Sequence, residues 1–240
     1  MITRRRLVQT IFLGGLVLTG LLALAPNQPD TLPVDSIVDA PYYHDSELLD
    51  RAWALPVTDR YKPYFEYQIN GAFCGPATVV DLFHSLGVHD LTQSTIFDKS
   101  DVSYWKARIF GLTLDEVAEL VEANGDLEVT VLRDLTFPEF REQLRHTNDL
   151  AYRYLINFNR APLFGVNVGH HSPLGGYLED HDLVFVLDVL EEYRPFLVPS
   201  ERLYEAMNTL DMETGKKRGL IRVRPSVAPS TTHDNAAITR

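Results

Sequence analysis

The sequence predicts an α+β protein in which a mainly helical N-terminal half packs on an antiparallel β-sheet from the C-terminal half. Between about residues 73 and 146, apolar residues recur every three to four positions, as on the buried face of a helix. After about residue 150 they gather instead in short runs separated by Gly, Pro and Asp. Those connections are too short for most crossovers between parallel strands, so antiparallel pairing is expected.

The expected helices have recognisable ends. The first begins at Cys74 and stops at Gly87, and Pro76 suits its first turn because a proline needs no N–H partner there. The second begins with a capping box, Thr113 to Glu116, and ends at Gly125. A third is expected at 138–146 and a fourth from Ser200, as its cap, to about 209. The expected strands are 127–132, 154–158, 163–168, 183–189 and 220–223.

Outside this domain, residues 1–25 form either a signal peptide or a membrane anchor. Three arginines, Arg4 to Arg6, precede an apolar run from Leu7 to Ala25. Its roughly 19 residues reach about 28 Å as a helix, enough for a hydrocarbon core. Pro26 would hinder cleavage, which favours an anchor, and the arginines favour a cytoplasmic N-terminus. The domain is therefore expected on the extracytoplasmic or periplasmic side, anchored or exported.

Two further segments are expected to lie outside the folded domain. Residues 26–50 contain four prolines among polar residues and predict an extended tether. Residues 225–240 have no apolar periodicity and predict a disordered tail. The folded catalytic domain is accordingly placed at 51–224.

Composition excludes several classes of function. The chain has 33 acidic and 22 basic residues and a formal net charge of −11. A nucleic-acid partner is not expected, because phosphates are neutralised by clustered Lys and Arg. A single cysteine excludes both an intramolecular disulfide and a Cys-rich zinc site. No metal-ligating residues are predicted.

Cys74 is the first candidate for chemistry. At the first turn of a helix it faces the positive end of the helix dipole, which favours thiolate over thiol. The thiolate is the nucleophilic form of cysteine. The alternative is that Cys74 is an ordinary packed residue, since free cysteine is among the most buried residue types.

A cysteine nucleophile needs a base, and the base needs an orienting group. His170 and His171 follow one expected strand, and Asp188 stands inside the apolar run that begins at Leu183. A carboxylate is costly to bury there without a partner, and an imidazole is a natural one. The alternative is that the two histidines lie in a solvated turn and Asp188 caps a strand end.

Four motifs together resemble the phytochelatin synthase family, in order over about residues 56–223. They are Phe73-Cys74-Gly75-Pro76-Ala77-Thr78, Gly169-His170 with Ser172 to Tyr177, Leu187-Asp188-Val189, and Ala206 to Asp211 followed by Thr214 to Gly219. The resemblance implies a papain-like fold, with helices from the N-terminal half packed on the sheet. It also implies a glutathione gamma-glutamylcysteinyltransferase, an acyltransferase of metal detoxification that releases glycine from glutathione and holds γ-glutamylcysteine as a thioester.

The resemblance also implies roles for single residues. Cys74 matches the nucleophile, His170 the general base, Asp188 the residue that orients it, and Gln68 the glutamine of the oxyanion hole. His170 is preferred over His171 because the family's histidine stands two residues before the serine of a Ser-Pro pair, here Ser172. The amide of Gln68 and the backbone N–H of Cys74 would stabilise the tetrahedral intermediate. Other substrate-binding residues are not predicted.

Two departures from the family affect the expected products. Glu191 stands where the family carries an arginine, and an acidic group would weaken binding of a second glutathione through its carboxylates. The cysteine-rich C-terminal domain of plant members is not seen, so the resemblance is to short bacterial members. Glutathione hydrolysis with limited transfer to a second glutathione is therefore expected.

The remaining expectations concern cofactors and partners. No cofactor is expected, and heavy metals such as cadmium or zinc would enter as glutathione thiolate complexes. The expected partners are glutathione and, through the N-terminal segment, the membrane, with a homodimer suggested by family analogy. The alternative functions are another γ-glutamyl or peptide hydrolase on the same fold without a role in metal handling, or a non-catalytic extracytoplasmic binding module.

Overall fold

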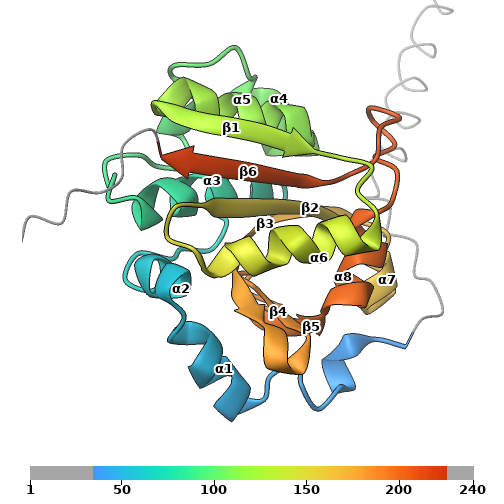
Figure 1. The fold of residues 1–240 in the computed structure, drawn as a ribbon. Helices are drawn as coiled ribbons and strands as arrows, with labels where there is room; N and C mark the ends of the chain where they lie inside the picture. The colour runs from blue at the N-terminus through green and yellow to red at the C-terminus, as the bar shows by residue number, and fades with distance from the viewer. Residues whose placement is uncertain (1–34, 226–240) are drawn as a thin grey trace, which may run out of the picture. The chain divides into compact units, whose positions relative to one another are not determined.

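The computed structural model describes residues 35–225, which form one antiparallel sheet flanked by helices (Figure 1). The described strands lie in the order β1-β6-β2-β3-β4-β5, and every neighbouring pair is antiparallel. The strands are β1 Leu127–Leu132, β2 Arg153–Asn159, β3 Gly169–Leu178, β4 Leu183–Val186, β5 Phe196–Pro199 and β6 Leu220–Pro225. The α-helices are α1 Ser46–Trp53, α2 Pro56–Tyr61, α3 Cys74–Ser85, α4 Tyr104–Phe110, α5 Leu114–Asn124, α6 Phe137–Arg145, α7 Ala161–Phe164 and α8 Ser200–Met207.

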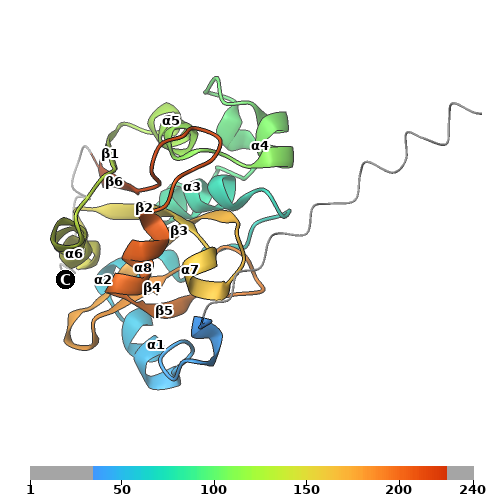
Figure 2. The ribbon, with the colours of Figure 1, turned by 90° about the vertical axis from the view of Figure 1, so that its right-hand side faces the viewer.

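Helices cover both faces of the sheet. Successive residues of a strand point to opposite faces, and on β2 Ile156 packs toward α6 and α8 while Leu155 packs toward α3 and α5. Figure 2 shows α6 and α3 on opposite sides of β2. The predicted α+β fold is confirmed, and a helix that begins at the cysteine packs on an antiparallel sheet as the expected papain-like arrangement requires.

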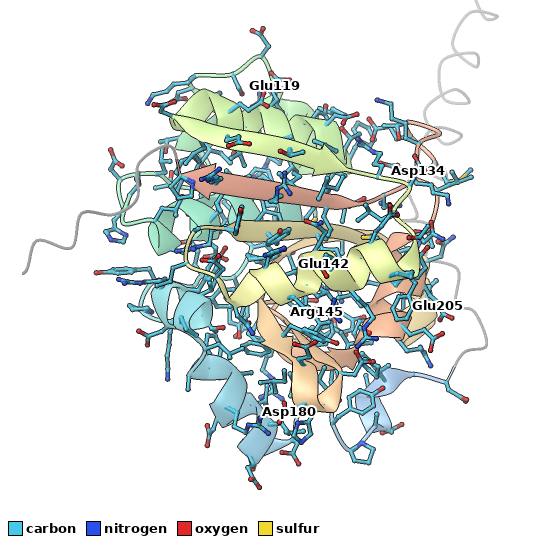
Figure 3. The ribbon with its side chains drawn as sticks, viewed as in Figure 1. Glu119, Asp134, Glu142, Arg145, Asp180 and Glu205 are labelled. Carbon is cyan, nitrogen blue, oxygen red and sulfur yellow. The ribbon has the colours of Figure 1, made fainter. Side chains whose placement is uncertain are left out.

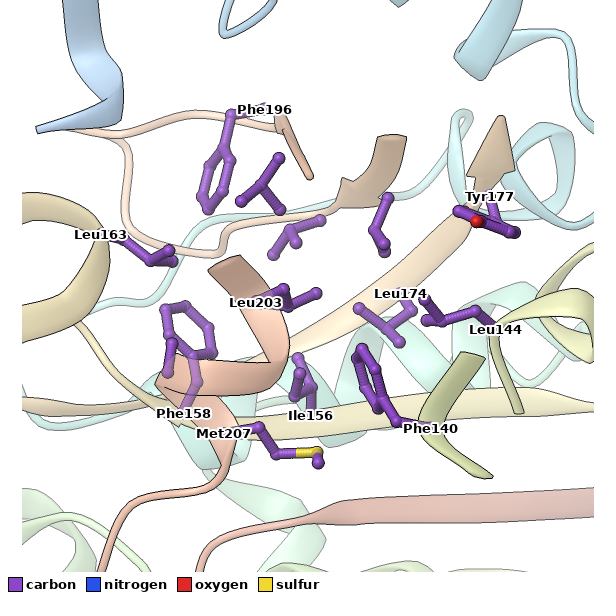
Figure 4. Packing of buried hydrophobic residues seen from close by; sticks show 14 of the residues in the cluster. Phe140, Leu144, Ile156, Phe158, Leu163, Leu174, Tyr177, Phe196, Leu203 and Met207 are labelled. Atoms are coloured by element: carbon purple, nitrogen blue, oxygen red, sulfur yellow. The ribbon is translucent and has the colours of Figure 1, made fainter. Parts of the chain in front are cut away.

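The apolar core between the sheet, α6 and α8 is closely packed. Figure 4 shows Phe140 of α6 and Leu203 and Met207 of α8 beside Ile156 and Phe158 of β2. All of these side chains are almost completely buried. Burial of this kind is the main stabilising contribution, about 25 cal/mol for each Å² of apolar surface removed from water, and it fixes the strands that carry the site.

Helix α3 is buried nearly all round, because helices and sheet both cover it. Only His84 among its residues is partly exposed. Val79, Val80 and Leu82 are fully buried and belong to the core that α3 shares with α5 and the sheet. A helix that is buried on every side cannot shift without losing core contacts, so the position of its first residue, Cys74, is fixed.

The folded part of the chain begins before the predicted boundary at residue 51. A short 3₁₀ helix spans Ile37–Asp39, and α1 begins at Ser46 with Asp45 as its cap. Ile37 is 1% exposed and Tyr43 4%, and both pack in the α6/α8 core. The described part of the expected tether is therefore docked on the domain. Residues 26–34, the expected anchor or signal at 1–25 and nearly all of the expected tail lie outside the described residues.

Most of the expected elements are observed. The helices expected at 74–87, 113–125 and 138–146 are α3, α5 and α6, and both Thr113 and Thr136 form complete capping boxes. The strands expected at 127–132, 154–158 and 220–223 are β1, β2 and β6. The helix expected from residue 200 is α8, but Ser200 is its first residue and donates to Asp182 instead of capping the helix.

The strand expected at 163–168 is wrong. Residues 161–164 form the short helix α7, which Asn159 begins by accepting a hydrogen bond from the backbone of Ala161 (2.7 Å) and which Gly165 ends in the left-handed conformation, φ 76°. Pro162 in its first turn has a backbone shape that suits a helix start. Local turn chemistry outweighed the apolar run.

Strand β3 was not expected, because its Ser-Pro and Gly-Gly pairs resemble a turn. Its glycines allow close packing instead: a Cβ on Gly176 would lie 2.4 Å from Leu55, and one on Gly175 2.9 Å from Phe185. The pairing with β4 shifts register between Leu174 and Gly176. The neighbouring strand β4 ends at Val186, so Asp188 lies just beyond the strand in which it was expected.

The described surface is strongly charged. Figure 3 shows Glu142 and Arg145 together on the exposed side of α6; their side chains form an ion pair of 2.8 Å, and Arg145 also binds Glu179. Within residues 35–225, none of the helices combines the length and apolar character needed to cross a membrane.

Candidate active site

Cys74 is the first residue of α3 and one end of a buried polar cluster. The residue before it, Phe73, caps the helix without a side-chain hydrogen bond, so no side chain at the cap accepts from the first backbone N–H groups of α3. The side chain is 8% exposed. A small opening with a positive helix end beneath it suits a nucleophile that is shielded from bulk water.

His170 and Asp188 lie together beside the cysteine. The Nε2 atom of His170, on β3, is 3.0 Å from Oδ1 of Asp188, and both side chains are buried. Asp188 follows β4, where Oδ1 also accepts the backbone N–H of Leu190 (2.8 Å), a local turn that fixes the carboxylate. His170 and Cys74 in turn shift each other's pKa through a hydrogen bond between their side chains. The structure thus brings the three predicted residues together.

Charges within this cluster shift each pKa in the direction that favours an ion pair. Burial raises the pKa of Cys74, but the hydrogen bond and charge of His170, a backbone N–H of His171 and the charge of Arg160 lower it below its ordinary value overall. Burial and Arg160 lower the pKa of His170, yet Asp188 and Cys74 raise it overall. Both shifts act in favour of a thiolate beside an imidazolium.

Arg160 is a member of the cluster that the sequence analysis missed. It is 2% exposed, and its Nη2 donates to both oxygens of Asp188, at 2.9 and 2.7 Å. Its guanidinium lies 3.8 Å from the ring centroid of Tyr193. Burial raises the pKa of Asp188, but His170 and Arg160 lower it overall, so the carboxylate stays charged. The available signal was Asp188 itself, since a buried carboxylate needs more than a neutral imidazole beside it.

His171, the rival base, belongs to a different environment. Its Nε2 lies 2.9 Å from the backbone oxygen of Leu112, and because a carbonyl only accepts, that nitrogen carries the proton. Burial lowers the pKa of His171 to about 3. A neutral imidazole bound to the backbone is poorly suited to act as a base. The side-chain geometry places His170, and not His171, beside Asp188.

Gln68 stands next to the cluster on the segment that precedes α3. Its backbone N–H donates to Val189 (2.8 Å), the residue after Asp188. Its side-chain Nε2 donates to the backbone oxygen of Asn70 (2.7 Å), which leaves one of the two amide protons for a substrate oxygen. The segment thus lies beside the other three residues, while the side-chain amide holds its own loop.

Arg218 is a second charged residue that the sequence analysis did not single out, although it lies in a motif quoted for the family resemblance. Its side chain is 9% exposed, and Nη1 donates to Asn157 of β2 (3.0 Å). It lies over Gly169, where a Cβ would come within 2.6 Å of Nη1. Burial lowers its pKa, while the charges of Asp211 and Cys74 raise it. A buried cation within electrostatic reach of the thiol is suited to bind an anionic group of a substrate.

The loop 208–219 that carries Arg218 is attached to the helices on the α3 side. Glu213 pairs with Lys106 of α4 (2.6 Å), and Lys216 pairs with Asp115 of α5 (2.8 Å). Arg133 also binds Asp115 and the backbone of Lys217. Figure 2 shows this red segment between α8 and β6 reaching toward α5. These ion pairs hold the loop on one side of the site.

Residues 35–225 contain no group of three or more His, Cys, Asp or Glu side chains arranged to hold a metal ion. The cluster around Cys74 contains one thiol, one imidazole and one carboxylate, all engaged with one another or with Arg160. The arrangement can therefore supply a nucleophile, a proton donor and acceptor, and fixed positive charge.

The chain is similar to known proteins of one family. The family model described as phytochelatin synthase matches residues 30–220. Similar proteins include glutathione gamma-glutamylcysteinyltransferase 3 of Lotus japonicus, 32% identical over 65% of this chain and 35% of the relative, and glutathione gamma-glutamylcysteinyltransferase 1 of Triticum aestivum, 32% identical over 70% and 36%. The chain thus spans about a third of the length of these curated relatives.

Solved structures were compared as well. The peptidase domain of Streptococcus ComA, a bi-functional ABC transporter, aligns with a TM-score of 0.46 and 17% sequence identity, over 67% of this chain and 96% of that domain. The peptidase domain of Streptococcus mutans ComA aligns with a TM-score of 0.40 and 16% identity.

Proposed function

Because the chain belongs to the phytochelatin synthase family, we propose that it cleaves glycine from glutathione through a γ-glutamylcysteinyl thioester on Cys74 and passes the acyl group to water or to a second glutathione. The observation that carries this proposal is the buried group of Cys74, His170 and Asp188, whose pKa shifts favour thiolate and imidazolium. Because this chain spans only about a third of its curated relatives, their activity and substrate apply to it only as part of this proposal.

The chemistry follows from the geometry. The Cys74 thiolate attacks the carbonyl carbon of the Cys–Gly peptide bond, and the backbone N–H groups at the start of α3 with the Gln68 amide stabilise the oxyanion. His170 gives the proton on Nδ1 to the glycine amine as it leaves. The same nitrogen then takes a proton from water or from the free α-amino group of a second glutathione as that group attacks the thioester carbonyl. The carbonyl–sulfur bond breaks and frees Cys74, and the product is γ-glutamylcysteine or, with the amine, a chain joined by a new peptide bond.

Asp188 and Arg160 act on this reaction indirectly, through His170 and Cys74. Asp188 holds the imidazole by Nε2 and stabilises its charged form, as the acidic member of a catalytic triad does. Arg160 keeps Asp188 ionised and lowers the pKa of the Cys74 thiol. Cys74 and His170 are therefore proposed as catalytic residues, and Asp188 and Arg160 as residues that position and charge them.

Arg218 is the proposed binding residue for the donor substrate. Glutathione carries two carboxylates, and the glycine carboxylate leaves with the product. A guanidinium held by Asn157 and lying over Gly169 can bind the carboxylate of the γ-glutamyl group, which remains on the enzyme as the thioester forms. Its fixed position would align the Cys–Gly bond with the sulfur.

Glu191 is proposed to disfavour the acceptor glutathione. Its side chain is exposed. Burial raises the pKa of Tyr67, the neighbour of Gln68; the charge of Glu191 raises it further, and the charge of Arg194 lowers it. An acidic group at that edge of the site repels carboxylates, whereas water needs no binding group. Hydrolysis to γ-glutamylcysteine is therefore the proposed main reaction, with short chains as minor products.

Several expectations remain part of the proposal. The apolar run before residue 26 would anchor or export the domain to the extracytoplasmic side, and a homodimer is suggested by family analogy alone. No cofactor is proposed, and cadmium or zinc would take part as glutathione thiolate complexes. Membrane flotation of the full chain tests the anchor, and analytical ultracentrifugation tests the dimer.

The decisive experiment incubates the full chain with glutathione and measures free glycine, with Cys74→Ser as the control. Glycine release that depends on Cys74 supports the proposal. Cys74-dependent cleavage of other γ-glutamyl or peptide substrates without glycine release from glutathione would indicate a different hydrolase on this fold. Glutathione binding without any cleavage would indicate a binding module.

A further inference from the structure

The segment Glu66–Ile69, which carries Gln68, is held at each of its residues. The backbone N–H of Glu66 donates to Oδ1 of Asp81 on α3 (2.9 Å), and that of Gln68 donates to Val189 (2.8 Å). The two remaining residues, Tyr67 and Ile69, are both held by one side chain, Gln93. Because irregular backbone has no ladder of its own, such contacts decide where its side chains lie.

Gln93 uses its whole amide on this segment. Its Oε1 accepts the backbone N–H of Ile69 (3.1 Å), and its Nε2 donates to the backbone oxygen of Tyr67 (2.9 Å) and to the Glu66 carboxylate (2.7 Å). The Gln93 side chain is 2% exposed, although it comes from the loop before the 3₁₀ helix Thr95–Phe97. It binds the peptide groups on both sides of Gln68, and none of these three hydrogen bonds is with the Gln68 side chain.

We infer that Gln93 is a positioning residue for the oxyanion hole: it fixes the backbone on either side of Gln68 and so places the Gln68 amide against the reacting carbonyl. For its catalytic consequence this inference rests on the proposed function. Asp81, on the helix that carries Cys74, binds the same segment. The nucleophile and the oxyanion donor are therefore both positioned by α3. A misplacement of about 1 Å can lower a rate by about 100-fold.

The kinetic test is a double-mutant cycle between Gln93→Ala and Gln68→Ala, read as glycine release from glutathione. Gln93→Ala is expected to lower kcat by about 10- to 100-fold with KM within about twofold. In the Gln68→Ala background, Gln93→Ala should cost little further, because its effect passes through Gln68. An undiminished loss in that background, or an unchanged kcat in Gln93→Ala, would overturn the inference.

A second pair of variants tests the bonds themselves. Gln93→Glu keeps the acceptor for Ile69 but sets a carboxylate against Glu66 and the oxygen of Tyr67, so kcat should fall. Glu66→Gln added to it supplies a donor in the opposite direction and should restore part of kcat. Rescue by Glu66→Gln is a result that a general loss of stability would not give. Gln143→Ala is the matched control, because Gln143, on α6, accepts one hydrogen bond from Tyr154 of β2 and none from the site.

A spectroscopic measurement separates this inference from the proposed function. The side-chain amide signals of Gln68 in a ¹⁵N spectrum should shift or broaden in Gln93→Ala and stay unchanged in Gln143→Ala. If the unmodified protein releases no glycine while the Gln68 signals still move, the proposed function fails and the positioning stands. Unmoved Gln68 signals in a folded Gln93→Ala or Gln93→Glu protein would refute the positioning itself.

Discussion

His170 and His171 are adjacent on β3, and both are almost fully buried, yet their surroundings are opposite in kind. His170 pairs in register with Phe158 and faces Asp188, while His171 pairs with Asn157 and faces the backbone of Leu112. The pKa of His170 is raised and that of His171 is lowered to about 3. Burial lowers both values, so the partner and not the burial decides which histidine carries a charge.

The same alternation separates two tasks. On the His170 face, Asp188 and Arg160 form a charged group that shifts the pKa of the Cys74 thiol. On the His171 face, Asn157 binds Arg218, the proposed holder of the substrate carboxylate. A strand whose side chains alternate can therefore carry proton transfer on one face and substrate binding on the other.

The largest difference in activity is expected between variants that lack His170 and variants that lack His171. His170→Ala and Cys74→Ser are expected to lower glycine release by about 10⁴-fold or more, since each removes a member of a unit that acts together. His171→Phe, which removes the neutral histidine, should keep most of kcat if the protein is folded. Glycine assays decide between them; an active His170→Ala protein with an inactive His171→Phe protein would reverse the assignment.

Substitution of the two charged residues near His170, Asp188 and Arg160, should shift the pH profile of activity in opposite directions. Because the pKa of Cys74 is lowered and that of His170 is raised, the pH profile of kcat/KM is expected to be bell-shaped. The midpoint of its acid limb, set by Cys74, should lie below pH 9.0, the ordinary thiol pKa. The midpoint of its alkaline limb, set by His170, should lie above pH 6.5, the ordinary imidazole pKa. Asp188→Asn should lower activity by about 100-fold and shift the alkaline limb to lower pH, because His170 loses the charge that raises its pKa.

Arg160→Met should give the contrasting shift. Without Arg160 the pKa of Cys74 rises, so the acid limb moves to higher pH. Activity at neutral pH should fall severalfold, because a smaller fraction of Cys74 is then thiolate. An unchanged profile for either variant, measured as kcat/KM against pH in a folded protein, would show that the buried charges do not set the titration of the site.

Arg218→Met should affect binding more than chemistry. Loss of a buried charged hydrogen-bond donor is expected to raise KM for glutathione by about 10- to 100-fold, corresponding to about 1.5–3 kcal/mol. The change in kcat should be smaller. Initial rates over a range of glutathione concentrations provide the measurement, and an unaltered KM would remove Arg218 from the proposed donor site.

The neutral histidine predicts a pH effect on stability. Folded His171 has a pKa of about 3 against 6.5 when unfolded, so below pH 6.5 the unfolded chain binds a proton that the folded one does not. Stability is therefore lost as pH falls from 6.5 toward 3. His171→Phe lacks this loss, although it leaves the Leu112 oxygen unpaired at a cost of about 1–3 kcal/mol. The difference in unfolding free energy between the two proteins should narrow on acidification; a constant difference in urea titrations would contradict it.

The smallest effect is on the fate of the acyl group. At moderate glutathione, γ-glutamylcysteine and glycine should be the main products, with longer chains minor even when cadmium or zinc is added. Glu191→Arg is expected to raise the proportion of chains severalfold while total glycine release changes little. Mass spectrometry of the products checks this, and abundant chains from the unmodified protein would show that Glu191 does not limit transfer.

The chemistry that the sequence analysis located and the chemistry it missed differ in physical kind. Cys74 was located because a helix start has a local pattern, and Asp188 because a carboxylate stands out in an apolar run. Arg160 and Arg218 were missed because a buried arginine is recognisable only by partners distant in the chain. The strand expected at 163–168 failed for the opposite reason: Asn159, Pro162 and Gly165 specify a helix locally, and an apolar run does not reveal that.

The ion pairs that attach the loop 208–219 make the site sensitive to ionic strength. Lys106, Glu213, Lys216 and Asp115 are partly exposed, so the attraction between them is screened over about 10 Å in 0.1 M salt. Arg218, at the end of that loop, is buried and keeps its own bonds. Added salt should therefore release the outer part of the loop first. Access to the Arg218 guanidinium would then increase before its attraction for a carboxylate weakens. Exchange of substrate and product would then quicken with moderate salt, even though the attraction between a carboxylate and Arg218 declines.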